Sequence, residues 1–217
     1  MKLAEGWVPV ALSSSIEAGT SAGAVVEGQE IVVWRDNSGK AHVWEDRCPH
    51  RGMRMSFGFV RGDHIACLYH GWQYDTAGQC RYIPAHPNLD VPQTIKIPTY
   101  RTEERYGIIW TTSSADAALP AIAGTEDAAP VRSVYIDCPP EAVLPALGEY
   151  SAAGANAGIV SVNGDRLLVA MQSISPAKSA LHVLLLEGSG TQKSYARWAQ
   201  DLRFVLEQPA PAVAEVA

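Results

Sequence analysis

Histidine is scarce in this chain of 217 residues and unevenly placed: there are six histidines, and only His182 lies beyond residue 112. An iron site of the two-His-one-carboxylate kind needs two imidazoles. The second half of the chain therefore cannot build such a site from its own side chains. The alternative hypothesis is an irregular iron site that takes His86 from the first half of the chain, His182 from the second half, and an acidic residue.

Long apolar runs, a basic surplus and nucleotide motifs are also absent. No stretch of about twenty apolar residues is present to span a membrane, and residues 1–7 have no apolar core of signal-peptide length. We therefore expect a soluble, cytoplasmic protein. The 17 basic and 23 acidic residues give a net charge of −6, which argues against nucleic acid as a partner. The sequence has no phosphate-binding glycine loop, nucleophile elbow or dinucleotide fingerprint.

Only four cysteines are present, and two of them stand in a pattern with histidine. The pairs are Cys48 with His50 and Cys67 with His70; sixteen residues separate His50 from Cys67, and a glycine follows each pair. Two thiolates and two imidazoles can hold a tetrahedral zinc ion or a two-iron cluster whose ends differ chemically. Typical zinc spacing sets the cysteines together and the histidines together, unlike the order found here.

The other cysteines and histidines have simpler interpretations. Cys80 and Cys138 are expected to stay reduced in the cytosol, with a disulfide between them as the alternative. His42 and His64 follow turns and are predicted to be exposed strand residues. His86 is predicted to lie in a solvent-facing loop, and His182 to be a packed histidine with a hydrogen bond.

The two Cys-His groups and their surroundings resemble the Rieske domain of the Rieske non-haem iron oxygenases. The matching runs are Cys48-Pro49-His50-Arg51-Gly52, Cys67-Leu68-Tyr69-His70-Gly71-Trp72, Gln73-Tyr74-Asp75 and Gly78, within a looser similarity over about residues 7–110. The resemblance implies a Rieske-type 2Fe–2S cluster, with Cys48 and Cys67 on one iron and His50 and His70 on the other. It also implies that Arg51 braces its loop, that Tyr69 and Trp72 pack over the cluster, and that electrons leave through the histidines.

Three positions distinguish this sequence from the Rieske proteins of respiratory complexes. Those proteins have a disulfide between the cluster loops and a serine that donates to a cluster sulfide. The corresponding positions here are Met53 and Tyr69 for the disulfide and Trp72 for the serine. Because fewer donors leave more negative charge on the cluster, we expect a low potential of the oxygenase kind.

Short segments rich in Val, Ile and Trp, separated by turns, predict a mainly β protein. We expect an antiparallel β-sandwich or barrel over residues 1–112, with strands at 7–12, 24–27, 30–35, 41–45, 57–61, 64–68, 72–75, 79–82, 98–103 and 106–112. Residues 113–130 are predicted as a linker and residues 209–217 as a disordered tail.

Residues 131–208 are predicted as a small α+β segment. Its expected strands are 131–137, 159–163, 166–173 and 180–187, and its expected helices are 140–150 and 191–208. The buried stripe of the last helix is predicted to be Tyr195, Trp198, Leu202 and Val205. This segment faintly resembles the end of the family's catalytic domain, as a reduced remnant that lacks the iron site.

The resemblance implies an electron-transfer component that is not catalytic alone. It would take single electrons from a ferredoxin or flavin reductase and pass them to the non-haem iron of a separate catalytic oxygenase subunit, within an oligomer. Arg47, Arg51 and Arg54, with Arg61 nearby, are interpreted either as a basic collar that steers an acidic donor or as braces of the loop. A purely structural, cluster-bearing subunit is a third hypothesis.

Overall fold

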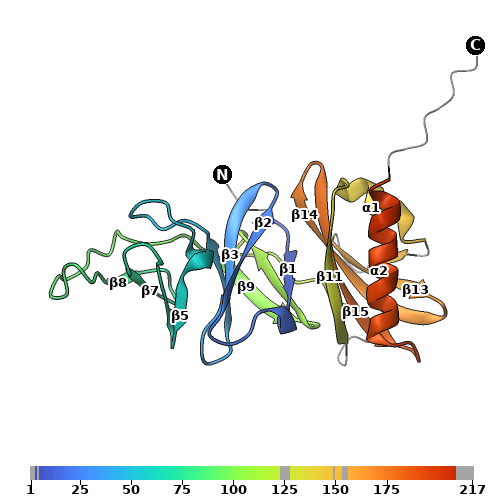
Figure 1. Ribbon diagram of the computed structural model, residues 1–217, viewed down its shortest axis with the longest axis horizontal. Coiled ribbons are helices and arrows are strands. Elements are labelled where there is room, and N and C mark those ends of the chain that lie inside the picture. The colour runs from blue at the N-terminus through green and yellow to red at the C-terminus, as the bar shows by residue number, and fades with distance from the viewer. Residues whose placement is uncertain (1–2, 4, 123–127, 149, 153–155, 209–217) are drawn as a thin grey trace, which may run out of the picture.

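Antiparallel β-sheet dominates the computed structural model, which describes residues 3, 5–122, 128–148, 150–152 and 156–208. Within these residues lie sheets of six, five and four strands and two α-helices. The four-stranded sheet forms one end of an elongated molecule, the six-stranded sheet lies in the middle, and the five-stranded sheet forms the other end (Figure 1). The predicted mainly β fold is confirmed. Neither helix of this described part has the length and apolarity to span a bilayer.

The six-stranded sheet curls into a nearly closed barrel. Its order is β1 (Val8–Leu12), β10 (Ile108–Thr112), β9 (Thr99–Arg105), β4 (Ala41–Glu45), β3 (Gln29–Arg35) and β2 (Ser21–Val26). The outer strands β1 and β2 contact each other, which almost closes the sheet. Buried branched side chains fill its interior, among them Ile31, Val33, Val43 and Ile109.

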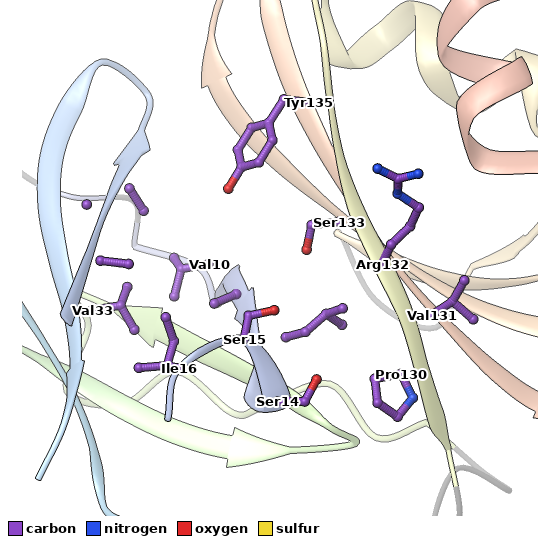
Figure 2. A pocket seen from close by; sticks show the side chains of 15 residues that line it. Val10, Ser14, Ser15, Ile16, Val33, Pro130, Val131, Arg132, Ser133 and Tyr135 are labelled. Atoms are coloured by element: carbon purple, nitrogen blue, oxygen red, sulfur yellow. The ribbon is translucent and has the colours of Figure 1, made fainter. Parts of the chain in front are cut away.

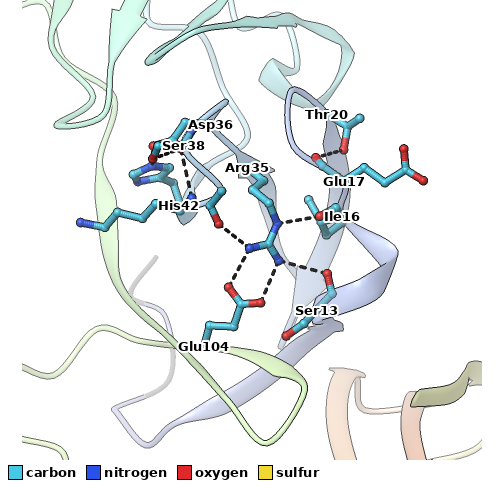
Figure 3. A network of polar contacts seen from close by, with 11 residues as sticks. Ser13, Ile16, Glu17, Thr20, Arg35, Asp36, Ser38, His42 and Glu104 are labelled. Atoms are coloured by element: carbon cyan, nitrogen blue, oxygen red, sulfur yellow. Dashed lines mark hydrogen bonds and ion pairs between the residues drawn. The ribbon is translucent and has the colours of Figure 1, made fainter. Parts of the chain in front are cut away.

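The turn between β3 and β4 is fixed by polar contacts (Figure 3). The Asp36 carboxylate accepts hydrogen bonds from the backbone N–H of Ser38 (2.9 Å) and Lys40 (3.0 Å) and contacts His42 Nε2 at 2.9 Å. His42 is only 7% exposed and stacks on Trp34 at a ring distance of 4.4 Å. The prediction that His42 is exposed was therefore wrong, because β4 is covered on both faces.

Arg35 connects β3 to neighbouring segments. Its guanidinium makes two hydrogen bonds to the Glu104 carboxylate on β9, of 2.7 and 2.9 Å, and donates to the carbonyls of Ser13 and Ile16 (Figure 3). Such a planar, two-point contact between guanidinium and carboxylate is geometrically specific. Arg35 thereby links β3 to β9 and to the segment that follows β1.

The four-stranded sheet consists of two short hairpins. The strands are β5 (Phe59–Arg61), β6 (His64–Ala66), β7 (Gln73–Asp75) and β8 (Cys80–Tyr82), in that order. A 3₁₀ turn at Met55–Phe57 precedes β5, so the strand begins later than predicted. The His64 side chain is 16% exposed and lies 2.6 Å from Arg81 Nη2, so its predicted exposure was also wrong.

The five-stranded sheet has the order β11 (Ala129–Ile136), β15 (Lys178–Glu187), β14 (Asp165–Ser175), β13 (Ala157–Val162) and β12 (Tyr150–Ala152). Helix α2 (Gln192–Leu206) covers one face, and α1 (Pro140–Ala146) lies beside it (Figure 1). The helix predicted over residues 140–150 ends at Ala146, and β12 was not predicted. Helix α1 contains Pro145, and Gly148 follows it at a φ of +74°; both end a helix.

The predicted stripe of α2 is correct for three of its four residues. Tyr195 is buried, and Trp198 and Leu202 pack against the same apolar cluster. Val205 is 65% exposed, so its predicted burial was wrong. Ala199 and Leu206 contact the sheet instead.

The other face of the five-stranded sheet packs against the barrel. One apolar cluster joins Trp7, Ile108 and Trp110 of the barrel to Leu168 and Leu184 of the sheet. The backbone N–H groups of Glu27 and Gly28, at the β2–β3 turn, donate to Ser173 O (2.9 Å) and Ile174 O (2.7 Å) on β14. The two halves of the molecule, the barrel with its four-stranded extension and the five-stranded sheet with its helices, therefore share an apolar core and are joined by backbone hydrogen bonds.

The predicted linker follows the surface of this junction in its described part. Trp7 Nε1 donates to Ala117 O at 3.0 Å, and Ile122 is buried in the shared cluster. Strand β11 begins at Ala129, inside the predicted range 113–130. The predicted tail, residues 209–217, lies outside the described residues.

Candidate metal centre

The first Cys-His loop is a tight turn between β4 and the 3₁₀ turn. Gly52 N donates to Cys48 O at 2.8 Å, and Cys48 N donates to Met53 O at 2.8 Å. Gly52 has a φ of +70°, a conformation that glycine adopts without the Cβ penalty. The turn points the Cys48 side chain into the core and leaves His50 at its outer side.

The second loop, between β6 and β7, repeats the same geometry. Gly71 N donates to Cys67 O at 2.9 Å, Cys67 N donates to Trp72 O at 2.9 Å, and Gly71 has a φ of +69°. A Cβ on Gly71 would lie 3.1 Å from Pro84 Cγ, so the glycine also lets a third loop approach. The left-handed backbone conformation of each turn therefore explains why a glycine follows each Cys-His pair.

The two loops bring the four predicted site residues together. Cys48 and Cys67 are 3% and 2% exposed, and their sulfur atoms share a hydrogen bond. The rings of His50 and His70 have centroids 4.7 Å apart, with His50 partly buried and His70 exposed. The side chains form an inner cysteine pair and an outer histidine pair. Two bridged irons need this division of ligands, whereas one zinc ion needs four ligands that converge.

Hydrogen-bond donors surround the Cys48 sulfur. Its pKa is lowered to about 6 by the hydrogen bond from Cys67, with further donation from the Tyr74 hydroxyl and from the backbone N–H groups of His50 and Arg51. The Tyr74 oxygen lies 3.2 Å from Cys48 Sγ. The pKa of Cys67 is raised, chiefly because it shares a proton with Cys48. The environment therefore favours the thiolate, the form that binds metal, at Cys48.

Aromatic rings flank the histidines. Trp72 stacks on His50 with a centroid distance of 4.3 Å and an interplanar angle of 5°. Tyr69 lies 4.0 Å from His70, but it is 54% exposed. Trp72 and Tyr69 thus each pack against one of the two predicted histidine ligands, and Tyr69 also presents an exposed ring beside His70.

The arginines around the first loop differ in their contacts. Arg47 and Arg54 both form ion pairs with Glu30 on β3, and Arg47 also donates to Gly52 O at 3.1 Å. The Arg51 side chain is exposed. Arg47 therefore braces the first loop, and the predicted brace by Arg51 stays a prediction. Glu30 and Tyr74 were missed as functional residues, since only the three-dimensional contacts identify them.

The histidines of the alternative iron site do not meet. His182 is completely buried on β15, and its ring nitrogens contact Ser133 Oγ (2.7 Å) and Gln172 Oε1 (3.0 Å). His86 is exposed in the loop after β8, at the other end of the molecule. Among the described residues, no three His, Cys, Asp or Glu side chains are grouped to hold a single metal ion. His182 is the packed, hydrogen-bonded histidine that was predicted.

Comparisons with known proteins agree with this geometry. Residues 6–101 match the family model described as Rieske [2Fe-2S] domain. Oxidoreductase NdmD of Pseudomonas putida is 39% identical over 107 residues, which cover 49% of this chain and 18% of that protein. Methylxanthine N1-demethylase NdmA of the same organism is 51% identical over 65 residues, which cover 30% of this chain and 18% of that protein. The matched regions thus span about a fifth of these curated relatives.

Solved structures extend the likeness in fold to the second half. The structure of NdmA from Pseudomonas putida CBB5 aligns with a TM-score of 0.75 at 20% identity, over 98% of this chain and 84% of that chain. Apo dicamba monooxygenase aligns with a TM-score of 0.78 at 17% identity, over 95% of this chain and 86% of that chain. The five-stranded sheet with its helix therefore belongs to the same architecture.

The paired Cys-His loops and the family match define residues 6–101 as a domain of the Rieske class. Residues 6–101 are a Rieske [2Fe-2S] domain, and the resemblance to the Rieske non-haem iron oxygenases is confirmed. The cofactor of this domain is a Rieske-type 2Fe–2S cluster.

Proposed function

We propose that this chain is an electron-transfer component of an oxygenase system, with Cys48, Cys67, His50 and His70 as the cluster ligands. The arrangement of these side chains is the observation that carries the proposal: two buried cysteines lie behind two outer histidines. A bound Rieske cluster supplies one-electron chemistry, and the protein sets its potential and accessibility. The chain's own contribution is to stabilise negative sulfur on the inside and to expose imidazole on the outside.

His70 and its surroundings provide the exit for electrons. His70 is exposed, and the exposed side chains of Leu68 and Tyr69 adjoin it in the same loop. A partner that docks on this tip contacts an imidazole directly. We place the acceptor, a mononuclear non-haem iron, on a separate catalytic subunit and in an oligomer with this chain. The donor is a ferredoxin or flavin reductase, in keeping with the similarity to a protein named oxidoreductase NdmD.

Charge at the tip supports an acidic donor. Arg47 and Arg54 share the single carboxylate of Glu30, which offsets one of their two charges, and the exposed Arg51 and Arg61 add two more. Exposed charges of this kind change association rates more than affinity. We place the protein in the cytoplasm, where thiols stay reduced, since neither Cys80 nor Cys138 forms a disulfide.

The ligand assignment is tested by cysteine variants. Cys67→Ser should lose the visible absorption and the rhombic electron-spin signal of the reduced cluster. Cys80→Ser is the matched control, because Cys80 is equally buried in the same apolar cluster but is not a proposed ligand. Loss of the cluster in Cys80→Ser with retention in Cys67→Ser would refute the assignment.

The electron-transfer role is tested by mixing the reduced protein with a candidate catalytic oxygenase subunit, its substrate and oxygen. We expect oxidation of the cluster and formation of product in matching amounts. Arg51→Gln should slow reduction by an acidic donor and weaken its salt dependence, whereas Lys193→Gln, an exposed cation on α2, should not. Product formation that proceeds without the cluster would support the purely structural role instead.

A further inference from the structure

A cavity of about 470 Å³ lies between the two halves of the molecule, away from the Cys-His loops. Val10, Ile16 and Val33 line it from the barrel, and Ser133 and Tyr135 line it from β11 (Figure 2). Its size is within the usual range of small-molecule sites, which favour junctions between structural units. The proposed electron-transfer role does not involve this cavity.

The β2 and β3 part of the cavity wall is apolar for a structural reason, whereas Ser14 and Ser15 add hydroxyls to the barrel side. Ala22 and Ala24 on β2 pair with Val33 and Ile31 on β3, so these four side chains share the inner face of the sheet. The two alanines are small and leave space where larger residues would fill the gap to β11. Figure 2 shows Val10 and Ile16 on the same side, facing Ser133 and Tyr135 across the cavity.

The polar side of the cavity is held by a directed chain of hydrogen bonds. Gln172 Nε2 donates to Val25 O at 2.9 Å, which leaves Gln172 Oε1 as an acceptor. Oε1 accepts from His182 Nε2 at 3.0 Å, so the proton of the neutral ring is on Nε2 and Nδ1 is an acceptor. Ser133 Oγ must therefore donate its proton to His182 Nδ1, at 2.7 Å.

This direction determines what Ser133 can offer to a ligand. Its only proton is committed to His182, so the hydroxyl presents lone pairs alone to the cavity. Burial lowers the pKa of His182 to about 4, so the ring stays neutral at pH 7 and the direction of the chain does not reverse. The weak basicity of this ring also argues against Ser133 as an activated nucleophile.

We infer that the cavity binds a compact, largely apolar molecule that carries one O–H or N–H donor, with Ser133 Oγ as the acceptor. The ligand contacts β1 and β3 on one side and β11 on the other, so it bridges the two halves. Binding at this site is independent of the cluster and of electron transfer. A ligand that lacks the donor leaves the Ser133 lone pairs unsatisfied and loses affinity.

The test compares two probes that differ in the donor. Saturation-transfer NMR and titration of the full-length protein are made with indole and with 1-methylindole, which has no N–H. We expect indole to bind about tenfold more tightly than 1-methylindole, as one lost hydrogen bond implies. No binding of indole, or equal binding of the two probes, would overturn the inference.

Three variants locate the binding. Ala24→Leu should abolish binding of both probes by filling the cavity. Ser133→Ala should remove the preference for indole, and Ser133→Thr, which keeps the hydroxyl, should restore it. Ser161→Ala on β13 is the control and should bind as the wild type does, since Ser161 does not line this cavity. Circular dichroism confirms that each variant is folded; undiminished binding in folded Ala24→Leu would place the ligand elsewhere and refute the site.

Discussion

Tyr74 is the donor to Cys48 that comes from outside the two Cys-His turns. It is fully buried on β7, and its hydroxyl lies 3.2 Å from Cys48 Sγ. The other donors to Cys48 are backbone N–H groups and the paired cysteine, which a side-chain substitution cannot remove singly. Tyr74 is therefore the side chain through which the sulfur environment can be adjusted one hydrogen bond at a time.

Tyr74→Phe should lower the reduction potential of the cluster by about 20–60 mV, the equivalent of one modest hydrogen bond for a one-electron couple. The sign follows because the donor stabilises the reduced cluster, whose sulfurs carry more negative charge. Protein-film voltammetry measures the shift. Tyr82→Phe, on the neighbouring strand and 36% exposed, should leave the potential unchanged. A rise in potential for Tyr74→Phe would contradict the assigned direction of the hydrogen bond.

His182 should make stability depend on pH. Burial lowers its pKa from 6.5 to about 4, so the unfolded chain binds a proton that the folded chain rejects. Neutral His182 therefore makes its full contribution to the free energy of unfolding above pH 6.5. The free energy of unfolding falls as the pH is lowered from there, by about 3 kcal/mol at pH 4. Urea unfolding of wild type and His182→Gln at pH 7 and pH 4 measures this. The variant should lose about 3 kcal/mol less on acidification; equal losses would refute the account.

Among the elements, the loop between β8 and β9, residues 83–98, depends on the hairpin of β7 and β8. Ile97 N donates to Gly78 O at 2.8 Å, and Cys80 N donates to Ile95 O at 2.9 Å. A Cβ on Gly78 would lie 2.4 Å from Ile97 O, and Gly78 has a φ of +77°. The glycine is needed both for the turn and for the approach of the loop.

Gly78→Ala should therefore lower the free energy of unfolding by about 3 kcal/mol, from the left-handed backbone together with the steric conflict. Gly39→Ala is the matched control: its φ is +91°, but nothing lies within 4 Å of the added carbon. It should cost only about 1 kcal/mol. Denaturant titration compares the two variants, and equal losses would mean that the loop does not depend on Gly78.

Sequence patterns predicted most elements because residues that favour turns mark the ends of the strands. The turn from Asp36 to Gly39 and the glycine after each Cys-His pair are local signals, and the structure shows the backbone conformations that they favour. The errors arose where distant segments decide. His42 is buried by packing across β4, and Val205 is exposed because α2 turns Ala199 and Leu206 toward the sheet. Likewise, the Cys-His motif predicted the two loops, but not the Glu30 or Tyr74 contacts.

For the whole molecule, the shared core between barrel and sheet should make unfolding cooperative. Leu184 on β15 is fully buried in the cluster that includes Trp7 and Trp110 of the barrel. Leu184→Ala should lower stability by about 2–5 kcal/mol. Hydrogen exchange should show the same loss for amides of β3 and of β14. A loss confined to β14 would mean that the halves unfold separately.

The central claim is that this chain carries electrons through a cluster bound by Cys48, His50, Cys67 and His70, and activates no oxygen by itself. Iron and acid-labile sulfide analysis after anaerobic purification and incubation with ferrous iron tests it most directly. The account predicts two irons and two sulfides per chain, in the proportion of a 2Fe–2S cluster. A third tightly bound iron that reacts with oxygen, or zinc in place of iron, would contradict it.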